Sequence, residues 1–236
     1  SMTRRCDGKE EDKVKAKIAD IFSSIQGEGK YFGSPMIFVR FAGCDVGCAW
    51  CDTDHAVREE LSAEDLISRI RVLYQPGFFI SLTGGEPLLQ VEALEEVLPL
   101  LKKEGMPVFL ETNGIRYQEF ARVSPWIDIV AMDFKLPSST GCRAFWAEHR
   151  EMIDLVRAKE VFVKIVVTAK TSLDDIDGAV DIIASVDPGI TVYLQPETSQ
   201  IKNGSLAACV TMQKRCLEKL KDVRIVPQVH RLLGIQ

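Results

Sequence analysis

The sequence has no long apolar run, no surplus of positive charge and no regular spacing of cysteines. None of its apolar stretches approaches the roughly 20 residues that a membrane-spanning helix needs, so we expect no membrane segment. The amino-terminal stretch is polar and lacks the apolar region of a signal peptide. The net charge of −5 is spread over both halves, so no basic surface for nucleic acid is expected.

The cysteine count is seven, an odd number without the spacing of a disulfide framework, which favours reduced thiols and a cytoplasmic location. Internal repeats, low-complexity tracts and linkers rich in Pro, Gly or Ser are also missing. We therefore predict one domain over residues 17–236. A charged and frayed amino terminus, residues 1–16, is expected to precede it.

Apolar runs of strand type alternate with helical segments along the rest of the chain. The expected strands, with the loops that end them, occupy residues 35–43, 77–87, 107–114, 127–135, 160–169 and 190–197, followed by a short one at 223–228. The expected helices occupy residues 62–74, 91–105, 118–123, 150–159, 172–186 and 205–222. This alternation predicts an α/β fold with a parallel sheet.

Polar loops that contain glycine end several of these strands, and in a barrel or partial barrel such loops share one face. We therefore expect a partial (incomplete) TIM-like barrel of about six parallel strands with the helices outside. The pattern alone also allows an open, doubly wound sheet.

The stretch GCDVGCAWCDT, residues 43–53, places Cys44, Cys48 and Cys51 in one tight loop after an expected strand. Three thiolates suit a soft or borderline metal centre. A structural zinc site needs a fourth ligand, which His55 could provide. The other interpretation is a [4Fe–4S] cluster, which normally takes four thiolates; with three, one iron keeps a position open for a small molecule.

A second motif, TGGEP at residues 83–87, follows the next expected strand. Its glycines would let the backbone approach a ligand closely, and its carboxylate could accept from an ammonium group. A strand-to-helix turn with Pro87 in the first helical turn explains the same residues. Combined with the CxxxCxxC loop and Trp50 before its last cysteine, the motif resembles the radical S-adenosylmethionine (SAM) superfamily. The resemblance implies a [4Fe–4S] cluster whose open iron is chelated by SAM, and cleavage of SAM to a 5′-deoxyadenosyl radical.

Other segments resemble one family of that superfamily, the 7-carboxy-7-deazaguanine synthases. They are the QGEG loop at residues 26–29, the Gly-x-Pro at 33–35, Arg40 on the next strand, the Cys-Asp-Thr at 51–53 and the Pro-Gln-x-His at 227–230. The resemblance implies conversion of 6-carboxy-5,6,7,8-tetrahydropterin to 7-carboxy-7-deazaguanine and ammonia, in the route to queuosine, archaeosine and related deazapurines. It also implies Mg²⁺ bound through Thr53, a homodimer, and an external electron donor of the flavodoxin or ferredoxin type.

The resemblance assigns two sets of residues to the ligands, with no catalytic residue beyond the cluster and SAM. The substrate set is Ile25, Gln26, Gly27, Glu28, Arg40, Thr83, His230 and Gln236, the last through its terminal carboxylate. The set for SAM is Gly84, Gly85, Glu86, Asn113, Asp133, Phe134, Lys135 and Gln195.

The side-chain chemistry of Arg40 and Asp133 also bears on their assignments. Arg40 suits a substrate carboxylate because a guanidinium binds both oxygens. Without the family resemblance, an ordinary surface arginine on an alternating strand would be the favoured interpretation. Many family members read S-P-K-P-P-S-S where residues 133–139 read DFKLPSS, so Asp133 and Phe134 depart from the pattern. Asp133 would replace a hydroxyl by accepting from the ribose of SAM.

The sequence leaves two alternatives to this function open. One is a glycyl-radical-enzyme activase of the same superfamily, against which the QGEG loop and the Pro-Gln-x-His segment speak. The other is a non-catalytic metal-binding module.

Overall fold

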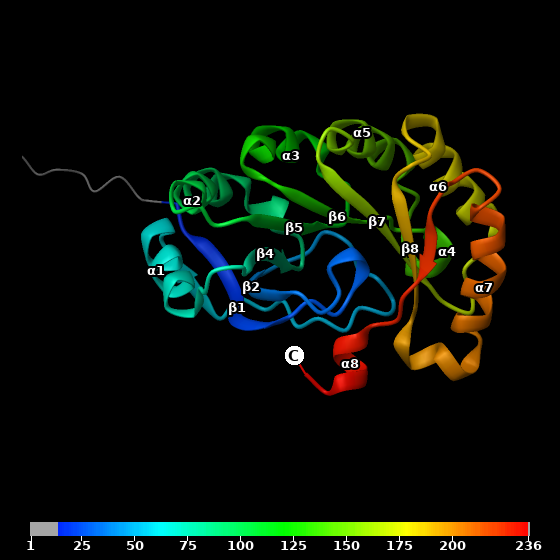
Figure 1. The fold of residues 1–236 in the computed structure, drawn as a ribbon, viewed down its shortest axis with the longest axis horizontal. Helices are drawn as coiled ribbons and strands as arrows, with labels where there is room; N and C mark the ends of the chain where they lie inside the picture. The colour runs from blue at the N-terminus through cyan, green and yellow to red at the C-terminus, as the bar shows by residue number, and fades with distance from the viewer. Residues whose placement is uncertain (1–13, 236) are drawn as a thin grey trace, which may run out of the picture.

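A computed structural model describes residues 14–235, which form one nine-stranded sheet with helices packed along one side (Figure 1). The strands are β1 (Ala16–Ile25), β2 (Pro35–Phe41), β3 (Glu59–Leu61), β4 (Phe79–Gly84), β5 (Val108–Thr112), β6 (Ile129–Asp133), β7 (Glu160–Val167), β8 (Thr191–Pro196) and β9 (Val223–Ile225). The sheet order is β3-β1-β2-β4-β5-β6-β7-β8-β9.

From β2 to β9 every neighbouring pair in the sheet is parallel, whereas β1 runs antiparallel to both β2 and β3. Since β3 and β9 stand at opposite edges, the sheet is open, which confirms the predicted partial barrel of parallel strands. The predicted short strand at 223–228 is β9. One boundary of the prediction was wrong: Ala16, counted with the frayed terminus, is 1% exposed and begins β1.

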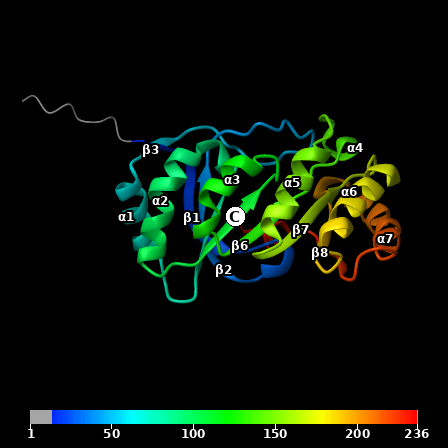
Figure 2. The same ribbon diagram turned by 90° about the horizontal axis from the view of Figure 1, so that it is seen from above.

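The longer helices lie on the outer side of the curved sheet, where Figure 2 shows them side by side from above. They are α1 (Ala63–Leu73), α2 (Val91–Lys103), α3 (Tyr117–Val123), α5 (Trp146–Val156), α6 (Leu173–Val186) and α7 (Ser205–Cys216). Two short helices, α4 (Pro137–Thr140) and α8 (Val229–Leu233), complete the set, with 3-10 turns at Gly29–Tyr31, Pro87–Gln90, Ser124–Trp126 and Thr198–Asn203. In Figure 1, α8 lies on the opposite side of the sheet from these longer helices.

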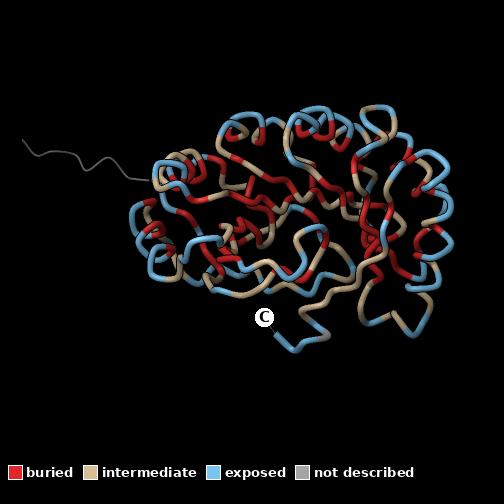
Figure 3. Tube along the Cα trace, in the orientation of Figure 1, coloured by how far each residue is buried: buried red, intermediate tan, exposed pale blue. Residues whose placement is uncertain are grey.

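The main hydrophobic core fills the space between the sheet and the outer helices (Figure 3). It takes every second residue of the strands, such as Val39 and Phe41 of β2 or Val163 and Ile165 of β7. No helix among residues 14–235 is both long and apolar enough to cross a membrane.

The inner face of the sheet carries the alternate residues and changes character along the strands. Toward the strand starts it is apolar, with a small cluster of Met36, Phe38, Phe109, Ile129, Phe162 and Tyr193. Two to four residues further along the strands the same face becomes polar, and the residues there are Arg40, Thr83, Glu111, Asp133, Lys164 and Gln195. Six neighbouring parallel strands thus each supply one polar side chain near their carboxyl ends.

Candidate active site

These six polar residues line a pocket of about 220 Å³ on the inner face of the sheet. Its walls come from the strand ends, the loop that follows β2, the QGEG loop and the segment around α8. Binding sites form where parallel strands end because loops from several strands meet there. The pocket therefore collects residues that are far apart in the sequence.

The cysteine loop, residues 43–55, brings all three thiols to this pocket. Its base is closed by a 2.9 Å hydrogen bond from the backbone N–H of Gly43 to the carbonyl of His55. On the far side, the N–H of Ala49 donates to the carbonyl of Thr140 at 2.9 Å. Backbone hydrogen bonds thus hold the loop where its two ends meet and at its middle.

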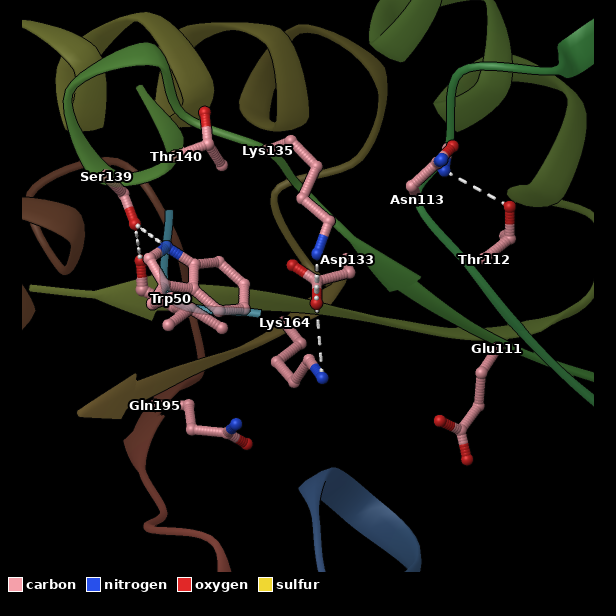
Figure 4. A network of polar contacts seen from close by, with 12 residues as sticks. Trp50, Glu111, Thr112, Asn113, Asp133, Lys135, Ser139, Thr140, Lys164 and Gln195 are labelled. Atoms are coloured by element: carbon pink, nitrogen blue, oxygen red, sulfur yellow. Dashed lines mark hydrogen bonds and ion pairs between the residues drawn. The ribbon is translucent and has the colours of Figure 1, made fainter. Parts of the chain in front are cut away.

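Side chains of the cysteine loop add further anchors. Asp45 accepts from Asn113 Nδ2 and from Arg116 Nε, both at 2.9 Å. Trp50 donates through its indole N–H to Ser139 Oγ at 3.1 Å (Figure 4). These contacts fix the loop to the segments that follow β5 and β6.

The two glycines of the GGE motif let β4 end directly against the cysteine loop. A Cβ at Gly84, whose φ is +125°, would overlap the backbone of Phe41. A Cβ at Gly85 would overlap the carbonyl of Gly43 and lie 3.0 Å from the Cβ of Cys44. Both positions therefore require glycine because two segments of the protein approach each other closely there.

Glu86 differs from its prediction as a ligand for SAM. Its side chain is fully buried, and its carboxylate accepts from Asn113 N at 2.7 Å, from Thr112 Oγ1 at 2.9 Å and from Leu88 N at 3.1 Å. Burial raises its pKa to about 7, although these three donors act to lower it. With its oxygens engaged by the protein, Glu86 fixes the end of β5 instead of facing the pocket.

The thiols of the cysteine loop are not arranged around a single ion. Within residues 14–235, no three His, Cys, Asp or Glu side chains are placed to hold one metal ion. His55 lines the pocket, but its Nδ1 lies 3.0 Å from the carbonyl of Thr53 in the same loop. This arrangement differs from a Cys₃His zinc site, and it is compatible with a cubane cluster, in which each thiolate binds a different iron.

The QGEG loop and the carboxy-terminal segment, residues 227–231, pack against each other at the pocket. The N–H of Val229 donates to the carbonyl of Gly27 at 3.0 Å, and a Cβ at Gly27 would lie 2.7 Å from the Cβ of His230. Gln228 donates through Nε2 to Glu28 Oε1 at 2.8 Å. The glycine and the segment therefore fit each other closely.

Arg231 connects this segment to the cysteine loop through an ion pair with Asp52. Asp52 precedes Thr53, whose hydroxyl donates to Asp52 Oδ1 at 3.4 Å. The carboxy-terminal segment thus contacts both the QGEG loop and the cysteine loop.

The floor of the pocket is organised by Glu111 of β5. Its Oε1 accepts from Gln26 Nε2 at 2.9 Å and from Ser81 Oγ at 3.1 Å, and its Oε2 accepts from Thr83 Oγ1 at 3.1 Å. Beside it, Arg40 lines the pocket with its guanidinium 5.7 Å from the ring centroid of Phe22.

Four largely buried charged side chains form a row along the other wall, and Figure 4 shows Lys135, Asp133 and Lys164 of this row. Lys135 Nζ lies 2.9 Å from Asp133 Oδ2, Lys164 Nζ lies 3.2 Å from the same oxygen, and Lys164 also lies 2.5 Å from Glu28 Oε2. Burial alone would raise the pKa values of Asp133 and Glu28, but the neighbouring ammonium groups lower both. Two cations and two anions therefore alternate in the pocket wall.

Comparison with known proteins identifies the family of this chain. The model of the radical SAM superfamily matches residues 38–181. The 7-carboxy-7-deazaguanine synthase of Geobacter sulfurreducens is 35% identical over 93% of this chain and 97% of its own, and that of Methanocaldococcus jannaschii is 31% identical over 92% and 99%. The chain belongs to the 7-carboxy-7-deazaguanine synthase family of the radical SAM superfamily.

The structural comparison agrees with this membership. The crystal structure of QueE from Escherichia coli has a TM-score of 0.64 and 25% sequence identity, covering 91% of this chain and 94% of that one. The radical SAM superfamily implies a [4Fe–4S] cluster and SAM as the cofactors.

Two features of the pocket wall fit these cofactors. The first is the donor set of Cys44, Cys48 and Cys51, since thiolates are the ligands of iron–sulfur clusters. Burial raises the pKa of the Cys48 thiol to about 11, so iron binding would have to displace its proton.

The second feature is a pair of buried acceptors, Asp133 Oδ1 and Gln195 Oε1, which find no donor among residues 14–235. Such acceptors fit the hydroxyl and ammonium donors that SAM presents.

Most of the predicted residues line the one pocket. From the substrate set these are Ile25, Gln26, Gly27, Glu28, Arg40, Thr83 and His230. From the set for SAM they are Gly84, Gly85, Asn113, Asp133, Lys135 and Gln195, and Thr53 joins the three cysteines. Gln236 lies outside the described residues.

Phe134, like Glu86, differs from its prediction. It is 1% exposed and packs behind the pocket wall, with its ring centroid 4.0 Å from that of His149. Because side chains alternate along an extended chain, Phe134 points to the opposite side from its neighbour Asp133.

Sequence reasoning missed Glu111, Lys164 and Gln228 as pocket residues. A signal for two of them exists. Glu111 is the single charge of β5, and Lys164 lies in the otherwise apolar run VFVKIVV of β7, where an unpaired charge would be costly. Gln228 lies inside the Pro-Gln-x-His segment, from which only His230 was chosen.

Proposed function

We propose that this chain converts 6-carboxy-5,6,7,8-tetrahydropterin to 7-carboxy-7-deazaguanine and ammonia. The observation that carries this proposal is that one pocket joins the three cysteines to Arg40, the QGEG loop and His230. The first group serves the superfamily's cofactors, and the second group is what distinguishes the family. The substrate loses one ammonia and nothing else, so the net reaction consumes no oxidant.

The chain's own residues account for binding of such a substrate. Arg40 presents a guanidinium that can bind both oxygens of the pterin carboxylate. Glu28 is held as a carboxylate by Lys164 and can accept from the amino and ring N–H groups at the pterin edge. A site with fixed hydrogen-bonding groups rejects analogues that lack the matching donors.

When bound, the cluster and SAM supply the one-electron chemistry that makes an organic radical. The protein must keep that chemistry away from water, and the contacts of the carboxy-terminal segment with the QGEG loop and the cysteine loop would close the pocket on one side. For Mg²⁺, we propose Thr53 as a ligand together with substrate oxygens and water, because Mg²⁺ prefers hard oxygen donors and keeps several waters.

The wider setting follows from the family resemblance and the cysteines. We propose a homodimer that takes electrons from a flavodoxin or ferredoxin. The described cysteines, Cys44, Cys48, Cys51, Cys142, Cys209 and Cys216, are all free thiols, which supports a reducing, cytoplasmic location. The continuous sheet, which begins at Ala16, supports a single domain from that residue onward.

The test is an anaerobic assay of the protein after cluster reconstitution, with SAM, a chemical reductant and 6-carboxy-5,6,7,8-tetrahydropterin. We expect 7-carboxy-7-deazaguanine and ammonia in equal amounts. A protein that cleaves SAM to 5′-deoxyadenosine but leaves the pterin intact would contradict the substrate assignment. One that forms no 5′-deoxyadenosine would be a metal-binding module.

A further inference from the structure

Lys164 stands at the middle of the buried row of charges, where the two predicted sets of ligand residues meet. In the sheet it pairs with Asp133 of β6 on one side and with Tyr193 of β8 on the other. Its side chain is 17% exposed, and its ammonium contacts Glu28, from the substrate set, and Asp133, from the SAM set. One cation therefore holds one carboxylate of each set.

The surrounding contacts leave Lys164 as the link between the two carboxylates. Glu28 is also held by the amide of Gln228 at 2.8 Å and, more weakly, by the amide of Gln195 from the SAM set at 3.2 Å. On the SAM side, Asp133 is also held by Lys135, whose ammonium lies 4.8 Å from the ring centroid of Trp50 in the cysteine loop. Both carboxylates have further partners, but among residues 14–235 Lys164 alone forms an ion pair with both of them.

We propose that Lys164 is a positioning residue that couples the binding of SAM to the binding of the substrate. This inference rests on the proposed function. A SAM molecule that donates to the free oxygen of Asp133 would fix that carboxylate, and with it the ammonium of Lys164 and the carboxylate of Glu28. The substrate would then find Glu28 already ordered and would lose less conformational entropy on binding. By linkage, the substrate must strengthen SAM binding by the same factor.

Charge balance explains why this role needs a cation. With Lys164 present, the row contains Lys135, Asp133, Lys164 and Glu28 and is neutral overall. Without it, two carboxylates face each other with Lys135 paired to Asp133, and Glu111 adds a further negative charge close to this position. Like charges at short range in a buried site repel strongly. Arginine at this position would keep the charge and could bind both carboxylates through its forked donors.

The experiment measures two dissociation constants of the reconstituted enzyme under anaerobic conditions without reductant, so that no turnover occurs. The constant for 6-carboxy-5,6,7,8-tetrahydropterin is determined with and without saturating SAM, and the constant for SAM with and without the pterin. We expect each ligand to tighten the other by about fivefold or more in the unmodified enzyme, a factor within the usual range of coupling. In Lys164→Met the factor should fall below about twofold, and Lys164→Arg should retain most of it.

A matched control is Lys102→Met, which removes a partly exposed lysine that pairs with Asp128 on α2's side of the sheet. It should keep the full coupling factor.

Glu28→Gln gives a second measurement that does not empty the space filled by Lys164. Like Lys164→Met, this variant should lose the coupling. This variant decides the matter if Lys164→Met fails to fold, as judged by circular dichroism.

Two results would overturn the inference: no coupling in the unmodified enzyme, or an unchanged coupling factor in the folded Lys164→Met variant or in Glu28→Gln. A purely structural role would lower the melting temperature and weaken both ligands without changing the factor. Failure of the proposed function looks different, because the unmodified enzyme would then neither bind nor convert the pterin.

Discussion

The backbone of Gly85 lies against the carbonyl group of Gly43, and no side chain fits between them. The next residue strengthens the contact, since the N–H of Glu86 donates to the same carbonyl at 2.9 Å. The N–H of Gly85 itself donates to the carbonyl of Phe41 at 3.1 Å. The GGE motif and the cysteine loop are therefore one packed unit, and the position of Cys44 depends on both.

We expect Gly85→Ala to displace the cysteine loop, because the added methyl group would overlap a backbone atom that cannot rotate away. Overpacking of this kind costs about 1–3 kcal/mol of unfolding free energy. Urea unfolding of the cluster-free protein would measure that loss, and iron content after reconstitution would report the displaced cysteine. Gly47→Ala is the matched control, since a Cβ there meets nothing within 4 Å. Equal stability and iron content in both variants would refute the packing argument.

Cys48→Ala should abolish cluster retention and the formation of 5′-deoxyadenosine, since one iron would lose its thiolate. The control is Cys142→Ala, which removes a half-buried thiol that precedes α5 and does not line the pocket. Iron analysis should give about four irons per chain for the control and far fewer for Cys48→Ala. If Cys142→Ala lost the cluster instead, the set of three ligands would be wrong.

Much of the fold could be predicted because its signals are local. The alternation of strands and helices, the three cysteines and the glycines at strand ends all lie within short stretches. The strand β1 and its antiparallel pairing with β2 were not predicted, although Ala16 and Ile18 are buried in it. Its polar residues interrupt the apolar pattern, and the pairing depends on a partner further along the chain.

The contacts within the site could not be predicted from local sequence signals. Lys164 lies in the run VFVKIVV, which is apolar on both faces as expected for a central parallel strand, so no alternation shows which face the lysine takes. Its partners come from the registers of β6 and β7 and from the QGEG loop, and none of these is encoded near residue 164. Glu86 shows the opposite problem: a motif suggested a ligand contact, while the turn after Gly84 directs the carboxylate into the protein.

Arg40→Ala should weaken substrate binding by about 1.5–3 kcal/mol, which is roughly 10- to 150-fold in the dissociation constant, because a charged hydrogen-bond partner of the carboxylate is lost. The affinity for SAM in the absence of substrate should stay unchanged. The control is Arg69→Ala, which removes a half-exposed arginine that pairs with Glu59 away from the pocket. Isothermal titration of the reconstituted enzyme measures both constants. An unaltered substrate constant in Arg40→Ala would mean that another group binds the carboxylate.

His149 is a buried imidazole behind the end of β5. Its Nε2 lies 3.0 Å from the carbonyl of Asn113, and because a carbonyl only accepts, Nε2 is the donor. Its Nδ1 is buried and finds no partner among residues 14–235, so a second proton would meet no acceptor there. Burial lowers the pKa of His149 to about 4 from its ordinary 6.5.

This shift makes the protein sensitive to acid. Since the unfolded chain takes up a proton near pH 6.5 and the folded one only near pH 4, stability is full above pH 6.5 and is lost as the pH falls toward 4. The expected loss from this group is about 3 kcal/mol. In His149→Phe the difference curve against the unmodified protein should show this dependence removed, together with a constant loss of about 1–3 kcal/mol from the missing hydrogen bond to Asn113. Urea unfolding of the cluster-free protein between pH 4.5 and 8 gives the curve, and parallel profiles for the two proteins would mean that His149 titrates normally.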